Sequence, residues 1–142
     1  MVGTLGDSLI ITVDAARDDF IAGIGYTFSG AIELERKKYI RGNHTSMVAE
    51  YYALIEAARL ATVHYQNSWE VTIYTDCEPL VSKMCGDEPT WGNWEDRRAG
   101  CMWMMNKFDS WQILYRPRSN HGRAHRLARE ALFEGREDEN LL

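Results

Sequence analysis

The chain has 142 residues, of which 45% are hydrophobic and 26% charged, and its net charge at pH 7 is −5. This composition is that of a globular protein, and the length suits one domain with its own core. No apolar run approaches the roughly 18 residues that span a bilayer, and the first eight residues carry no signal-like core. We therefore expect a single cytoplasmic domain over residues 1–142, monomeric and without a membrane partner. Residues 1–8 and 135–142 are expected to be flexible ends.

The cysteine content argues against a disulfide framework or a zinc site. Cys77, Cys85 and Cys101 are odd in number and form no C-x-x-C pair, so we expect three packed thiols. The negative net charge argues against a nucleic-acid partner, because phosphate contacts require local positive charge. The basic residues are unevenly placed, however, and are densest over residues 116–129. Composition alone therefore leaves such a partner open.

The first forty residues carry the patterns of β-strands. Residues 9–13 are almost wholly apolar and predict a buried central strand that ends at Asp14, with residues 15–19 as a polar connection. Residues 20–28 and 31–40 alternate and predict a second and a third strand, paired as antiparallel hairpins.

From residue 45 the hydrophobic period becomes helical, which predicts a long helix over residues 45–65 with Thr45 or Ser46 at its cap. The later elements alternate, and we expect a strand at 70–74, a short helix at 77–85, a helix at 95–108, a strand at 111–115 and a helix at 122–133. Three antiparallel strands followed by this alternation predict an α/β fold with a mixed sheet flanked by helices.

Three acidic residues lie where burial should make them costly. Asp14 and Asp76 each follow an apolar strand, and Glu50 shares a helical face with alanines and a leucine. A carboxylate near a core is unfavourable unless it is paired or binds a cation. Each acid alone also fits a capping or ion-pairing role. Three from separate elements favour a shared site for hard divalent ions, which cleave phosphodiesters when two lie about 4 Å apart.

Two histidines at four-residue spacing add a candidate metal ligand. His121 and His125 fall on one face of the predicted last helix, and imidazoles so spaced can reach one metal ion. A single histidine is more often an ordinary surface or core residue, which is the interpretation we give to His44 and His64.

Five motifs then occur in order: ITVDA at residues 11–15, TSMVAEYYALI at 45–55, YTDCEPLV at 74–81, RPRSN at 116–120 and AHRLAREAL at 124–132. This series resembles ribonuclease H type 1, particularly its compact archaeal and bacterial forms. The resemblance covers nearly the whole chain, from about residue 9 to residue 132. Each motif alone is modest, and their order and spacing make the resemblance specific.

The resemblance implies a ribonuclease H-like fold, with a five-stranded mixed sheet in the order 3-2-1-4-5 and strand 2 antiparallel. It implies endonucleolytic hydrolysis of the RNA strand of RNA–DNA hybrids with two Mg²⁺ or Mn²⁺ ions. By position, Asp14 would bridge both ions, and Glu50 and Asp76 would complete the catalytic site. The family's fourth ligand is normally an aspartate, and His125 stands there. Its neutral nitrogen suits Mn²⁺ better than Mg²⁺.

A hybrid would then be held by polar groups beside the acids and by residues near the last helix, namely Ala15, Arg17, Asn43, Thr45, Ser46, Arg118, Asn120 and His121. Short polar loops suit contact with 2′-hydroxyls across a wide minor groove. The tryptophans Trp91, Trp94 and Trp103 could contact a DNA backbone, but packing is the interpretation we favour.

Two other functions fit parts of the pattern. A non-catalytic ribonuclease H-like domain that only binds nucleic acid would account for the missing fourth carboxylate, but it gives three acids no reason to stay near a core. A DNA nuclease on the same fold, such as a resolvase-like or exonuclease-like enzyme, would also use acidic residues. The segments 45–54 and 75–81 favour the hybrid-specific enzyme over it.

Overall fold

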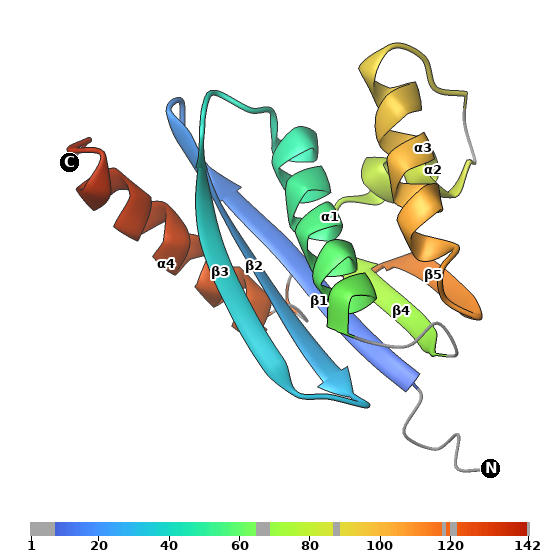
Figure 1. The fold of residues 1–142 in the computed structure, drawn as a ribbon. Helices are drawn as coiled ribbons and strands as arrows, with labels where there is room; N and C mark the ends of the chain where they lie inside the picture. The colour runs from blue at the N-terminus through green and yellow to red at the C-terminus, as the bar shows by residue number, and fades with distance from the viewer. Residues whose placement is uncertain (1–7, 65–68, 87–88, 118, 120–121, 142) are drawn as a thin grey trace.

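The computed structural model describes residues 8–64, 69–86, 89–117, 119 and 122–141. This part of the chain forms a five-stranded sheet with four helices (Figure 1). The strands are β1 (Ser8–Arg17), β2 (Ile21–Gly30), β3 (Leu34–Arg41), β4 (Glu70–Thr75) and β5 (Ser110–Tyr115), and the helices are α1 (Ser46–His64), α2 (Glu78–Cys85), α3 (Asn93–Met105) and α4 (Gly122–Asp138). None of these helices is long and apolar enough to cross a membrane.

The strand order in the sheet is β3-β2-β1-β4-β5. Strand β2 runs antiparallel to β1 and to β3, whereas β4 is parallel to β1 and to β5. Figure 1 shows α1 on one face of the sheet, α4 on the opposite face, and α2 with α3 beside the β5 edge. The predicted mixed sheet, its order and its antiparallel second strand are confirmed.

Strand β1 is longer than its apolar run indicates. The prediction that it ends at Asp14 is wrong, because pairing with β2 continues through Asp14↔Gly25 as far as Arg17↔Ala22. A tight turn makes this possible, since the Oδ1 of Asp18 accepts hydrogen bonds from the backbone N–H groups of Phe20 and Ile21 at 2.8 and 3.0 Å. Strand β1 therefore continues on both sides of Asp14 along the chain, which fixes the backbone of this residue.

The last helix also continues beyond its predicted end at Phe133, to Asp138. Gly135 is buried, and Arg136 forms an ion pair with Asp18 at 2.7 Å. Glu139 accepts hydrogen bonds from Tyr39 and Arg41 at 3.1 and 3.0 Å. These residues therefore lie against the sheet and do not form a free tail. The other end expected to be flexible lies, except for Ser8, outside the described residues.

Helix α1 meets the sheet through a face of small side chains. The hydroxyl of Thr45 caps it by accepting a hydrogen bond from the N–H of Val48 at 3.2 Å. The buried alanines of this face are Ala49, Ala53, Ala57, Ala58 and Ala61. Small side chains let a helix lie close to the strand beneath it, which brings any longer side chain on the same face to the end of that strand.

The cysteines and tryptophans follow the predictions only in part. The three cysteines are free, as expected, and Cys101 is buried, but Cys85 is exposed. Trp94 packs against the core. The expectation of packing is wrong for Trp91 and Trp103, whose residues are 77% and 68% exposed. Trp91 precedes α3, and Trp103 lies within it.

Two glycines of β2 set the distance between the sheet and α4. A Cβ at Gly23 would lie 2.2 Å from the backbone oxygen of Ala128, and one at Gly25 would lie 2.6 Å from the backbone oxygen of Ala124. Neither contact can be relieved by turning a side chain, because both partners are helix backbone. The absence of a Cβ at these positions therefore lets α4 contact β2 directly.

We expect Gly23→Ala to lower the free energy of unfolding by about 3 kcal/mol, because the added methyl group must push α4 away from the sheet. Gly100→Ala is the matched control, since the nearest atom to a Cβ there is the Tyr51 hydroxyl at 4.0 Å. Within α3 that change should stabilise the protein by about 0.5–1 kcal/mol. Urea denaturation measures both values, and equal effects of the two substitutions would contradict the close approach.

Candidate metal centre

Asp14 is the innermost acid of the site, and its side chain is fully buried. Its Oδ1 accepts a hydrogen bond from the backbone N–H of Ala15 at 2.8 Å, and its Oδ2 lies 2.8 Å from Nδ1 of His125. Because β1 fixes the backbone and both oxygens have partners, this carboxylate has a defined orientation.

Glu50 reaches the same point from α1, and only 5% of the residue is exposed. Its Oε1 accepts a hydrogen bond from the N–H of Ala15 at 2.9 Å, and its Oε2 accepts one from the hydroxyl of Thr75 at 3.3 Å. That hydroxyl in turn accepts a hydrogen bond from the N–H of Cys77 at 3.2 Å. The contacts tie α1 to the ends of β1 and β4, so Glu50 is positioned by three elements.

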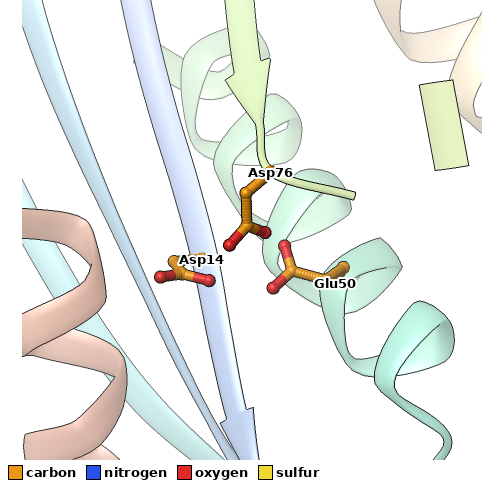
Figure 2. Close-up of side chains that lie close together, drawn as sticks. All are labelled: Asp14, Glu50 and Asp76. Carbon is orange, nitrogen blue, oxygen red and sulfur yellow. The ribbon is translucent and has the colours of Figure 1, made fainter. Parts of the chain in front are cut away.

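Asp76 follows the last residue of β4 and is half-buried. One possible ligand atom from each of Asp14, Glu50 and Asp76 lies within 4.8 Å of the other two. Figure 2 shows the three carboxylates converging from β1, α1 and the end of β4. Three carboxylate oxygens facing one point are the donor set that hard divalent ions such as Mg²⁺ and Mn²⁺ prefer. The residues therefore fit such an ion.

The electrostatics of the cluster favour a bound cation. Burial raises the pKa of Glu50 far above its ordinary value, and the hydrogen bond with Asp14 and the charges of Asp14 and Asp76 raise it further. The hydrogen bond from Ala15 opposes this rise but is outweighed. Without a cation, Glu50 therefore holds a proton at neutral pH, and a divalent ion would take the place of that proton.

His125 lies beside the cluster, on the α4 side of Asp14. Its Nδ1 is 2.8 Å from Asp14, and 28% of its side chain is exposed. It is not part of the group of described residues whose ligand atoms lie mutually within 4.8 Å. The structure thus brings together three of the four predicted ligands, and His125 joins them through Asp14.

Those predicted substrate-binding residues that the structure describes lie around this centre. Ala15, Arg17 and Ser46 line the pocket that contains Glu50 and Asp76. The guanidinium of Arg17 donates a hydrogen bond to Asn43 at 2.9 Å, and Thr45 caps α1 next to Ser46. Arg118, Asn120 and His121, which were also predicted to bind the substrate, lie outside the described residues, so the predicted His121–His125 pair is not tested.

Sequence reasoning missed several neighbours of the centre. Thr75 is fully buried and holds Glu50, and its place just before Asp76 at the end of an apolar strand is the signal that could have found it. Glu78 and Tyr115 line the same pocket as Glu50 and Asp76. Tyr115 belongs to β5, and only the parallel pairing of β5 with β4 brings it there.

Comparison with known proteins agrees with this geometry. The family model described as Reverse transcriptase-like matches residues 20–131, a range that includes Glu50, Asp76 and His125 and begins after Asp14. No curated protein matches the sequence of this chain.

Three solved structures illustrate the similarity of fold. The RNase H1 of the halophilic archaeon Halobacterium salinarum NRC-1 is 27% identical, with a TM-score of 0.79 over 89% of this chain and 98% of that one. LC11-RNase H1 was isolated from compost by a metagenomic approach, and its structure was solved in complex with an RNA/DNA hybrid. It is 27% identical to this chain, with a TM-score of 0.77 over 89% of this chain and 98% of that one. An N-terminal RNase H domain from Mycobacterium tuberculosis is 22% identical, with a TM-score of 0.80 over 93% and 98% of the two chains, and shows likeness of fold alone.

The strand order, the acidic cluster and the family match over most of the chain agree with one another. The chain therefore belongs to the Reverse transcriptase-like family of ribonuclease H-like domains.

Proposed function

We propose that this domain is an endoribonuclease that hydrolyses the RNA strand of RNA–DNA hybrids with two divalent cations, Mg²⁺ or Mn²⁺. The observation that carries the proposal is the cluster of Asp14, Glu50 and Asp76 at one end of the sheet, in which Asp14 and Glu50 are buried. Similarity to LC11-RNase H1, which was solved with an RNA/DNA hybrid, supports the choice of substrate.

The carboxylates of Asp14, Glu50 and Asp76 would hold the cations. When bound, such ions lower the pKa of water and stabilise the leaving oxygen of the cleaved phosphodiester. The N–H of Ala15 and the hydroxyl of Thr75 orient Glu50 toward the other two acids. His125 orients Asp14 through its Nδ1, as partners beyond the metal ligands commonly do.

His125 is the observation that favours the second candidate, a non-catalytic domain that binds hybrids. It stands where the resemblance leads us to expect a fourth carboxylate, and it adds no negative charge to hold a second ion. Against this candidate, Asp14 and Glu50 are buried, share the N–H of Ala15 as a hydrogen-bond donor and converge with Asp76, an arrangement that is unfavourable without a cation.

Mg²⁺ or Mn²⁺ should raise the melting temperature of the protein, because only the folded chain gathers the three carboxylates. At a hundredfold excess over Kd, one ion stabilises by about 2.7 kcal/mol. Scanning calorimetry with and without EDTA measures the shift. An unchanged melting temperature at millimolar cation would contradict the site.

The cation-induced shift should grow with pH. The pKa of Glu50 is raised in the folded protein, so the stabilisation by its proton is complete below the unfolded pKa near 4.5. That stabilisation is lost as the pH rises toward the pKa of the folded protein. Because the cation takes the place of this proton, the cation binds with less competition at higher pH. Glu50→Gln should remove the pH dependence and the cation shift together. A cation shift that is equal at pH 6 and pH 8.5 in the wild type would contradict the protonated state of Glu50.

The wild-type protein should cleave a labelled RNA–DNA hybrid, and Asp14→Asn should slow that cleavage by about a hundredfold or more, since a metal ligand is lost. Asp109→Asn is the matched control, because Asp109 is exposed and lies outside the cluster. Double-stranded RNA and DNA of the same sequence test the substrate class. Cleavage of DNA, or no cleavage with either cation, would refute the proposed activity.

His125→Asp should retain or increase cleavage with Mg²⁺, because it adds a carboxylate beside the centre. Without cation, the same change should lower the melting temperature, since the new charge would face Asp14. His125→Asn is the control that keeps a polar side chain without adding charge. If His125→Asp abolishes cleavage with both cations, histidine is itself required at this position.

A further inference from the structure

A second pocket lies on the α4 side of the metal centre. Arg17 and Ser46 line both this pocket and the pocket that contains Glu50 and Asp76. Helix α4 contributes Arg129, Phe133 and Arg136 to the second pocket. His125, which contacts Asp14, also faces it. The two pockets therefore meet beside the acidic cluster, and a strand that crosses the cluster would enter the second pocket next.

This pocket is basic although the chain as a whole is acidic. Its lining contains three arginines and no aspartate or glutamate among the described residues. Arg136 is engaged by Asp18, and Arg17 donates to Asn43 while its Nε is buried without a hydrogen-bond partner. Arg129 forms no hydrogen bond or ion pair with another described residue. The pocket thus holds unused donors of the kind that phosphate oxygens accept.

One wall of the same pocket is apolar. Leu132 and Phe133 line it, and Phe133 is 52% exposed. Arginines that contact phosphates beside an aromatic ring are a usual means of holding one nucleic-acid strand. In a paired hybrid, the sugar is the part of the strand that such a ring can contact. An inorganic anion or an acidic peptide would leave the ring unused.

The geometry points to a nucleotide subsite for the cleaved strand in this pocket: a phosphate beside the scissile one is bound by Arg129, with its ribose packed on Phe133. The identity of the strand rests on the proposed function. The subsite also supplies local positive charge that a strand needs in order to approach three carboxylates.

The test neutralises one backbone phosphate at a time in the RNA strand of a labelled hybrid. Each tested position carries a 2′-deoxy methylphosphonate and is compared with the same 2′-deoxy residue bearing an ordinary phosphate. Fluorescence anisotropy measures binding to four proteins that all carry Asp14→Asn to prevent hydrolysis. One has no further change, and the others add Arg129→Ala, Arg129→Lys or Arg36→Ala. Arg36 is the charge-matched control, because it is exposed on β3 and lines neither pocket.

Neutralising one RNA-strand phosphate near the cut should weaken binding about tenfold when Arg129 is present. With Arg129→Ala this penalty should vanish, and the slope of log Kd against log salt should fall by about one. Arg129→Lys should restore part of the penalty, and Arg36→Ala should leave it intact. The subsite is refuted if no position depends on Arg129, or if the dependent phosphate lies on the DNA strand.

The two proposals fail separately. Binding with an Arg129-dependent phosphate but no hydrolysis by the wild-type protein would refute only the proposed cleavage. Hydrolysis by the wild-type protein with penalties that are the same in Arg129→Ala would refute only the subsite. In the active enzyme, Arg129→Ala should raise KM and leave kcat nearly unchanged, since the contact lies away from the bond that breaks.

Discussion

The crowding of three acidic side chains, two of them buried, is the constraint on which the rest of this site depends. Ligand atoms of Asp14, Glu50 and Asp76 lie within 4.8 Å of one another, and burial removes from Asp14 and Glu50 the water that would screen a charge. The protein meets this with a shared hydrogen-bond donor, the N–H of Ala15, which contacts both Asp14 and Glu50. That donor belongs to the backbone of β1, so the register of β1 fixes the centre of the site.

Two helices on opposite faces of the sheet complete the site from different directions. Helix α1 delivers Glu50 because its alanine face lies close to β1. Helix α4 delivers His125 because glycines in β2 leave room for its backbone. Asp14 is paired with Gly25, so the position that lets α4 approach lies directly beside the acid that His125 contacts. The contacts that pack the two helices against the sheet therefore also position the residues of the site.

Charge is distributed unevenly across the two pockets of the site. The pocket with Glu50 and Asp76 is acidic, and the adjoining pocket on α4 is basic. Several cations outside the basic pocket are engaged in surface pairs, such as Lys37 with Glu130 and Glu134. A net charge of −5 is compatible with a polyanionic substrate, because the arginines of the basic pocket place positive charge beside the acids. Net charge alone could not reveal this.

The sequence by itself determined the fold class, the strand order through its resemblance, and the three acids, because period and motif are local properties of the chain. It placed Asp14 at the end of its strand and Phe133 at the end of the last helix, and both were wrong. Strand β1 is extended by pairing with β2, and α4 by contacts of Gly135, Arg136 and Glu139 with the sheet. Only the tertiary structure decided that Thr75 holds Glu50, that His125 contacts Asp14 and not the whole cluster, and that Arg129 and Phe133 share a pocket. Each of these depends on how closely elements distant in sequence approach, and backbone contacts at the β2 glycines set that distance for α4.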